Sequence, residues 1–222
     1  MAACAILPNV DSAIIYSGGE PTEGVCMEFR LLFKGAIKSQ GAGPEVHEIR
    51  RMLHPQLKQL WSNHAMLQAV VRQYGLSAGS VSDDDSIQRG IDALAESHYD
   101  LRFLPLVADD RFVRCELDIL FLRREQPGRV FMKGDIDNRL KTLFDALRIP
   151  DAKEQVRNHV PSDGENPLYV LLTDDKLVTD LKVSTDQLLM LPGEIYDSNQ
   201  VFLVIRVKLQ PYQPSPWQRA MM

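Results

Sequence analysis

The segment GDIDNRLKTLFDALRIP, residues 134–150, constrains the fold most, because it joins an acidic start to a strong helical pattern. Four large apolar residues recur within it at i, i+3, i+4 and i+7: Leu140, Leu143, Phe144 and Leu147. This spacing predicts a helix with one apolar face, which must be buried against another element. Asp137 or Asn138 suits the N-cap of the helix, and Pro150 ends it.

Alternation of apolar and polar residues predicts strands on both sides of this helix. The first covers residues 26–35, where the apolar positions between Met27 and Leu31 are separated by other residues. Four further stretches have strand character: 99–108, 111–124, 177–184 and 200–210. Asp109 and Asp110 lie between two of these strands and predict the turn of a hairpin.

Two more helical stretches are predicted before the first of those later strands. A long helix should start at Pro44, and Pro55 should kink it or divide it in two, since proline lacks the backbone N–H that a helix uses. A shorter helix is predicted at 87–96, with Ser82 or Asp83 as its cap. The order of elements predicts an α+β fold: a single mixed β-sheet of about four to five strands with two main helices packed on it.

Length and composition allow one sizeable domain. With 222 residues, 45% of them hydrophobic, the chain can build a core without disulfides or a structural metal. We predict a single domain over residues 26–210, preceded by a loosely packed arm (1–25) and followed by an extended tail (211–222).

The cysteines and the apolar segments indicate the cellular compartment in which the protein is expected. Cys4, Cys26 and Cys115 are odd in number and lack CxxC spacing, so neither a disulfide framework nor a zinc site is indicated. No signal peptide is evident, and no apolar run approaches the roughly 18 residues of a membrane span. The expected location is therefore cytoplasmic.

Asp135 and Asp137 are the candidate chemical groups at the start of the predicted helix. On an extended segment, side chains two residues apart point to the same face, and Lys141 lies one helical turn further on. Two adjacent carboxylates repel unless a cation or a proton intervenes, and oxygen ligands suit Mg²⁺ or Mn²⁺. The spacing predicts a divalent metal, although the same pattern is also typical of a surface turn or a helix cap.

The run KGDIDNRLKTLFDAL resembles the signature of the RusA-type Holliday-junction resolvases, Asp-x-Asp-Asn-x-x-Lys followed by an apolar helix with Phe-Asp-Ala-Leu. Eight positions match in register: Asp135, Asp137, Asn138, Lys141, Phe144, Asp145, Ala146 and Leu147. The family also has an acidic pair leading into a strand, and Asp174 and Asp175 match it here. Relative to the family pattern, residues near 68–98 and 151–173 read as insertions.

The resemblance implies a Mg²⁺-dependent endonuclease, with Mn²⁺ as a possible substitute, that resolves Holliday junctions or related branched DNA in recombination and repair. Asp135, Asp137 and Asp175 would be the catalytic metal-binding carboxylates, with Asp174 as the neighbouring candidate. Lys141 would stabilise charge developing on the phosphate. The family also implies a homodimer, because a four-way junction presents two symmetry-related strands, and a phage or prophage origin. Asp145, one turn after Lys141, is interpreted as a residue that positions this lysine.

The net charge limits how DNA could be held. The whole chain has 25 basic and 30 acidic residues, a formal charge of −5, which argues against a protein that coats nucleic acid. Residues 111–148 nevertheless contain nine basic and six acidic residues. We therefore expect DNA to be bound locally, by this basic segment, and in a way that depends on the structure of the DNA. Four residues are candidates for DNA contact: Arg123, Arg124, Lys133 and Arg139.

Two other functions remain open. The first is a catalytically weak RusA-like module that binds DNA or a protein partner through its insertions. The second is an unrelated metal-dependent nuclease or transferase that uses the Asp-x-Asp pair. The sequence has neither a GxSxG motif nor a GxxxxGK[ST] phosphate loop, so serine hydrolases and P-loop enzymes are not indicated. His47, His54 and His64 lack an accompanying metal motif and are interpreted as surface or packing residues.

Overall fold

The computed structural model describes residues 27–39, 41, 43–77, 82–124, 135–157, 159–189, 199–215 and 217. Within these residues the helices are α1 (Gly43–Asn63), α2 (Ala65–Ser77), α3 (Asp83–Leu94) and α4 (Asp135–Leu147). The strands are β1 (Glu28–Ala36), β2 (Glu96–His98), β3 (Leu101–Val107), β4 (Val113–Arg123), β5 (Leu168–Leu172), β6 (Val178–Gln187) and β7 (Gln200–Pro211). The 3₁₀ turns are η1 (Asp109–Arg111), η3 (Lys153–Val156) and η4 (Asp175–Leu177). The predicted arm and half of the predicted tail lie outside the described residues.

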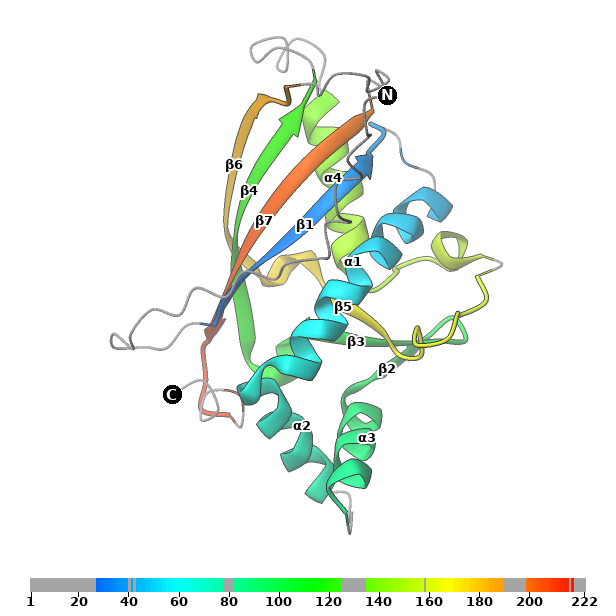
Figure 1. Ribbon diagram of the computed structural model, residues 1–222, viewed down its shortest axis with the longest axis vertical. Helices are drawn as coiled ribbons and strands as arrows, with labels where there is room; N and C mark the ends of the chain where they lie inside the picture. Colours follow the sequence, from blue (N-terminus) through cyan, green and yellow to red (C-terminus); the bar gives the residue numbers. More distant parts are fainter. Residues whose placement is uncertain are drawn as a thin grey trace, which may run out of the picture.

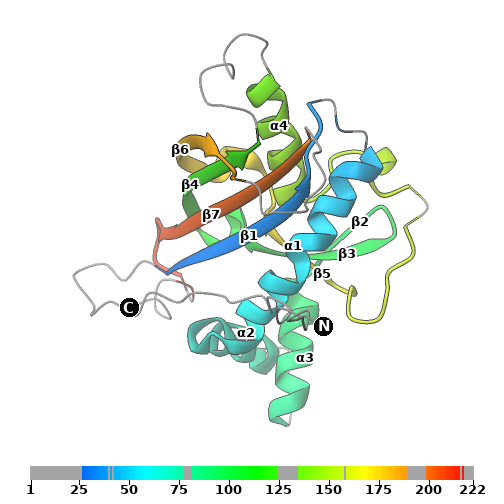
Figure 2. The ribbon, with the colours of Figure 1, turned by 45° about the horizontal axis from the view of Figure 1, so that its top comes forward.

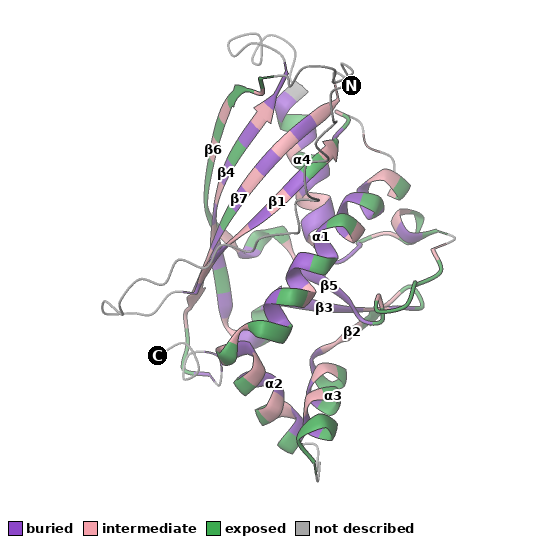
Figure 3. Cartoon of the chain, in the orientation of Figure 1, coloured by how far each residue is buried: buried purple, intermediate pink, exposed green. Residues whose placement is uncertain are grey.

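A four-stranded sheet in the order β1-β7-β4-β6 is the main platform of the fold (Figure 1). The first three strands pair antiparallel, whereas β4 and β6 run parallel. Burial alternates along β1, β4 and β7, as Figure 3 shows, because successive side chains of a strand point to opposite faces. The apolar face packs with α1 and α4 in one continuous core.

A second sheet, in the order β2-β3-β5, has three strands. Its strands β3 and β5 pair in parallel. The α+β class and a mixed sheet with helices packed on it are confirmed, but the strands divide between two sheets rather than forming one.

The predicted hairpin between residues 99 and 124 is wrong. β3 and β4 are consecutive in the chain but belong to different sheets. Between them the chain forms η1, and Phe112 adopts a left-handed backbone conformation with φ of 57°. The acidic turn therefore redirects the chain from one sheet to the other instead of folding it back.

The long helix is divided, but not at Pro55, which lies inside α1. The division falls at His64, between α1 and α2. There the side chain of Gln68 donates a hydrogen bond to Trp61 O at 2.7 Å, and a side chain thus satisfies a carbonyl of the last turn of α1. The predicted cap of the next helix is confirmed, because the hydroxyl of Ser82 accepts a hydrogen bond from Asp85 N at the start of α3.

Helix α4 lies along the apolar face of the four-stranded sheet (Figure 2), and contacts at its two ends fix its direction. Near its start, Arg139 donates to Ile37 O, just after β1. At its other end, Arg148 forms a parallel bridge with Leu172, the last residue of β5. The N-terminal end of α4 therefore lies at the end of the sheet where β1 finishes. No described helix is long and apolar enough to cross a membrane.

Candidate functional site

The acidic motif sits on the first turn of α4, not on an extended segment. The helix begins at Asp135, two residues before the predicted cap. The expectation that Asp135 and Asp137 share one face required extended backbone, and in a helix residues two apart do not face each other. Because the backbone here is helical, the argument from extended backbone for a preformed pair of carboxylates no longer applies. Asp137 and Asn138 are exposed.

Lys141 is exposed on the same helix, one turn after Asp137. Within the described part of the chain, neither side chain has a hydrogen-bonding or ion-pairing partner, so both are available to a ligand. A carboxylate, an amide and an ammonium group, those of Asp137, Asn138 and Lys141, thus project from the first two turns of α4. This end of the helix presents groups that could meet a metal ion or a phosphate.

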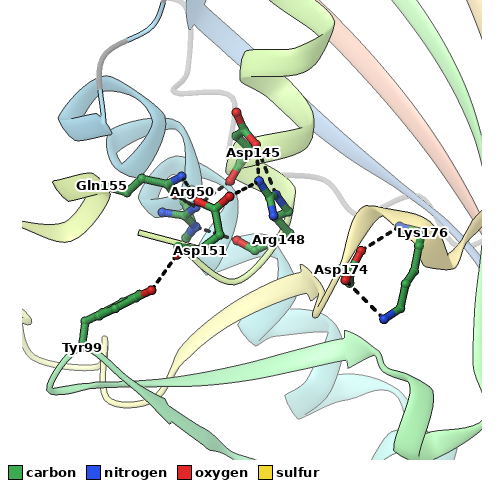
Figure 4. A network of polar contacts seen from close by, with 8 residues as sticks. All are labelled: Arg50, Tyr99, Asp145, Arg148, Asp151, Gln155, Asp174 and Lys176. Atoms are coloured by element: carbon green, nitrogen blue, oxygen red, sulfur yellow. Dashed lines mark hydrogen bonds and ion pairs between the residues drawn. The ribbon is translucent and has the colours of Figure 1, made fainter. Parts of the chain in front are cut away.

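Asp174 and Asp175 lie at the turn between β5 and β6. Asp174 caps η4: its Oδ1 accepts a hydrogen bond from Lys176 N at 3.0 Å, and its Oδ2 lies 3.3 Å from Lys176 Nζ. The backbone hydrogen bond from Lys176 is the main reason that the pKa of Asp174 is lowered. Asp175 is exposed. Figure 4 shows Asp174 and Lys176 apart from the cluster around Arg148.

The two acidic groups lie at opposite ends of α4. Asp174 follows Leu172, whose backbone bridges Arg148, and the helical rise from Asp137 to Arg148 is about 16 Å. Ligands of one Mg²⁺ all lie about 2.1 Å from the ion, and paired catalytic ions are about 4 Å apart. The described residues contain no group of three His, Cys, Asp or Glu side chains that could hold a metal. Within a single chain, therefore, Asp137 and Asp175 do not fit a shared metal site.

The C-terminal end of α4 is occupied by a buried guanidinium that the sequence analysis did not identify. Arg50, on α1, is 1% exposed. Its Nε donates to Arg148 O at 2.9 Å, and its Nη2 donates to Asp145 O at 2.6 Å and to Gln155 Oε1 at 3.1 Å (Figure 4). Burial lowers the pKa of Arg50 to about 9, which still leaves it protonated at neutral pH. We call these four residues the Arg50 network; only the helical spacing around Ile49 and Leu53 could have suggested that Arg50 faces inward.

Asp145 belongs to this network and does not position Lys141. Its Oδ1 accepts hydrogen bonds from Arg148 Nη2 at 2.7 Å and from Arg148 Nε at 3.2 Å. Arg148 also reaches Asp151 Oδ2 at 2.7 Å. The interpretation of Asp145 as the partner of Lys141 is therefore wrong, because the closer cation on the helix is Arg148, three residues on.

Most of the residues predicted to contact DNA are placed inside the protein. Arg139 is 5% exposed, and its Nη1 donates to Ile37 O at 2.7 Å, so its role is to fix α4 to the end of β1. Arg123 and Arg124 are also buried. Basic residues near a predicted site can thus be structural, and their burial argues against phosphate contact by all three. Lys133 lies outside the described residues.

The other candidate groups have structural roles. His54 accepts a hydrogen bond from Tyr169 N at its Nδ1, and its Nε2 lies 3.1 Å from Gly164 O. Burial lowers the pKa of His47 to about 3, so this ring is neutral. Cys115 is buried, and burial raises the pKa of its thiol to about 12, as expected for a packing residue.

A cleft of about 480 Å³ lies between α1 and the loop around Gly164. Its cations are already engaged with this loop: Lys58 Nζ donates to Gly164 O at 2.9 Å, and Arg51 Nε donates to Glu165 Oε1 at 2.7 Å. These contacts between α1 and the loop close one side of the cleft. None of the residues that line the cleft belongs to α4, which carries the acidic motif.

Comparisons with protein-family models, with curated proteins and with solved structures give no match for this chain. The proposal for its function accordingly depends on its own residues.

Proposed function

We propose that the protein is a structure-selective DNA endonuclease of the RusA type, which acts on four-way junctions or related branched DNA in recombination or repair in the cytoplasm. The observation that carries the proposal is the exposed group of Asp137, Asn138 and Lys141 on the first two turns of α4. These residues match the family signature, and within the described chain the charged side chains among them have no structural partner.

The roles of these residues follow from their chemistry. The ammonium of Lys141 can pair with a non-bridging phosphate oxygen and stabilise the charge that develops there. The carboxylate of Asp137 can accept a proton from water or contribute to a cation site. The proposed cofactor is Mg²⁺, or Mn²⁺ in its place. Of the carboxylate set implied by the resemblance, Asp135, Asp137 and Asp175, the structure describes the side chains of Asp137 and Asp175, and these lie at opposite ends of α4.

The test is cleavage of a labelled four-way junction in the presence of Mg²⁺. The parent protein should nick the junction, and Asp137→Asn should reduce the rate by about 100-fold or more, since the lost group acts in the chemical step. Lys141→Ala should also reduce the rate. The matched control is Asp163→Asn, an exposed acidic residue in the loop beside α1, which should cleave like the parent. Absence of cleavage by the parent, or equal cleavage by the parent and Asp137→Asn, contradicts the proposal.

A second function, a RusA-like module that binds branched DNA or a protein without cutting, is favoured by one specific observation. Asp174 is engaged by Lys176, and both Asp174 and Asp175 lie at the far end of α4 from Asp137. Such a module should bind the junction in a gel-shift assay without cleaving it, and it should give no heat of binding on titration with Mn²⁺.

A further inference from the structure

The end of β1, the start of α1 and the first turns of α4 lie close together, as Figures 1 and 2 both show. Two side chains of α4 hold the connection between β1 and α1 in place. Arg139 donates a hydrogen bond to Ile37 O at 2.7 Å. The hydroxyl of Thr142 lies 3.2 Å from Lys38 O and 3.1 Å from Asn138 O. This connection therefore lies directly on the helix that carries the exposed group of the proposed site.

A cavity of about 250 Å³ lies between these three elements, and we call it the β1–α1 cavity. Its apolar walls include Phe33, on β1, and Ile49, on α1, both of them buried. Ala36 and Met52 line the same cavity and are exposed, so it is open to solvent. Pockets for drug-sized ligands have volumes of about 300–1,000 Å³. The β1–α1 cavity therefore has room for a single ring system.

The polar groups of the β1–α1 cavity are mainly hydrogen-bond acceptors. Its charged residues are Lys38, Glu45 and Glu48. Lys38 Nζ pairs with Glu45, and Arg51 Nη1 donates to Glu48 Oε2 at 3.2 Å. An ionised carboxylate has about four acceptor positions, so these pairs leave acceptors available to a ligand. The hydroxyl proton of Thr142 is directed at backbone carbonyls, so this residue does not donate into the cavity.

These charges disfavour an anion and favour a neutral ligand that donates hydrogen bonds. The lining has one positive and two negative groups, so it repels a phosphate. Adenine, cytosine and guanine are planar, uncharged rings that carry an exocyclic amino group, whereas thymine has none. Carboxylates accept hydrogen bonds from such amino groups in protein–DNA complexes. An amino-bearing nucleobase thus matches both the apolar walls and the acceptors.

The β1–α1 cavity is adjacent to the groups proposed to act on phosphate. Each residue of an α-helix turns by about 100°, so Asn138 lies about 40° from Thr142 on one side and about 60° from Lys141 on the other. Thr142 lines the cavity, and Lys141 is exposed. A base in the cavity and a phosphate at Lys141 would therefore contact neighbouring parts of one helix surface.

We propose that the β1–α1 cavity binds an amino-bearing nucleobase that is turned out of the stack at the branch point, while Lys141 pairs with a phosphate beside it. This inference rests on the proposed function, because it takes branched DNA as the substrate. Turning a base out of a duplex costs a few kcal/mol, and the cost is lower where pairing and stacking are already interrupted. The cavity thereby gives a preference for branched DNA over an intact duplex.

Fluorescence of 2-aminopurine, an amino-bearing base analogue, tests the cavity without any cleavage. The analogue is placed at the branch point of a four-way junction, and EDTA removes metal ions. Stacking quenches 2-aminopurine, so its fluorescence should rise severalfold when the parent protein saturates the junction. Ala36→Leu fills the cavity and should abolish this rise. The matched control is Ala93→Leu, at an exposed position of α3, which should give the same rise as the parent.

Changing the base at the probe position tests recognition of the amino group. A junction with adenine there should bind about tenfold more tightly than one with thymine, the effect of one hydrogen bond to a charged acceptor. Glu45→Gln, Glu48→Gln or both should reduce this ratio to less than about threefold, because the charged acceptor is lost. Asp163→Asn, in the loop beside α1 and outside the cavity lining, should keep the ratio of the parent.

Two results overturn the base site. The first is fluorescence that does not change when the parent binds, or a rise that Ala36→Leu retains while melting at the temperature of the parent. The second is equal affinity of the parent for adenine and thymine junctions, or a preference that both glutamine variants leave unchanged. If Ala36→Leu does not fold, the two glutamine variants still decide, because neither Glu45 nor Glu48 is buried.

The base site and the nuclease fail separately. A parent that raises the fluorescence in EDTA but does not cleave the junction with Mg²⁺ supports the base site and contradicts the nuclease. A parent that cleaves the junction without a rise supports the nuclease and overturns the base site. A parent that does not bind the junction overturns both.

Discussion

The two ends of α4 use similar residue types for opposite purposes. At the C-terminal end, Asp145 and Arg148 are bound to each other and to the buried Arg50. At the N-terminal end, Asp137 and Lys141 are exposed, and no described residue pairs with either. Acidic and basic side chains one turn apart are thus structural at the end where they pair with each other and their backbone carbonyls accept hydrogen bonds from a buried cation, and they remain available at the other end.

This difference has an energetic basis. A buried guanidinium costs several kcal/mol to desolvate and is tolerated only when its donors are satisfied, as those of Arg50 are by two backbone carbonyls, the amide oxygen of Gln155 and Nδ1 of His47. Exposed charges cost little and contribute little to folding. Stability should therefore respond to changes at the C-terminal end of α4, and ligand binding to changes at the N-terminal end.

The largest effect on stability is expected from Arg50→Ala. It removes the donor for Asp145 O, Arg148 O and Gln155 Oε1 and leaves a cavity, so the free energy of unfolding should fall by about 3–5 kcal/mol. Urea denaturation measures this value. Arg89→Ala, on the exposed side of α3, is the matched control and should cost less than about 0.5 kcal/mol. A loss below about 1 kcal/mol for Arg50→Ala would show that the network does not stabilise this end.

An intermediate effect is expected at Glu165, in the loop before β5, which pairs with Arg51 on α1. Burial alone would raise its pKa, but hydrogen bonds from Ser162 N and Arg51 Nε lower the pKa to about 2. Because the folded carboxyl has the lower pKa, its stabilisation is present above about pH 5 and is lost as the pH falls toward 2. Between roughly pH 6 and pH 3 the parent should lose about 2 kcal/mol more than Glu165→Gln in urea denaturation. Parallel pH profiles for the two proteins would contradict this assignment.

The smallest effect on stability is expected from Lys141→Ala. The side chain is exposed and alanine favours helix, so the free energy of unfolding should change by less than about 0.5 kcal/mol. The same change should lower junction cleavage, which separates the two ends of α4 by function. A loss of stability comparable to that of Arg50→Ala would mean that Lys141 is a structural residue.

Local sequence patterns were sufficient to predict the position of most helices and strands. Alternation located β1, β6 and β7, and helical spacing located α4, because periodicity reports directly which face of an element is buried. The break of the long helix was misplaced at Pro55. A proline is tolerated when its neighbours in the core hold the helix together, and the observed break, at His64, is accompanied by a hydrogen bond from the Gln68 side chain to Trp61 O.

Contacts between distant segments were not predictable from these patterns. The two strands flanking Asp109 separate into different sheets, because β3 pairs with β5, more than sixty residues later in the chain. Arg139 and Arg123 have the composition of DNA contacts but are buried, and nothing local to them signals this. The placement of Asp174 and Asp175 at the far end of α4 follows from the bridge between Arg148 and Leu172.

The sequence by itself determined the α+β class, the bounds of α4 to within a few residues, and the chemical groups at its start. Only the tertiary structure decided that the strands form two sheets and that Asp137 and Asp175 lie apart. The physical reason is that periodicity and capping depend on neighbours within a turn or two. Sheet order and buried ion networks depend on segments about 100 residues apart, such as Arg50 and Arg148, whose separation in the chain carries no local signal.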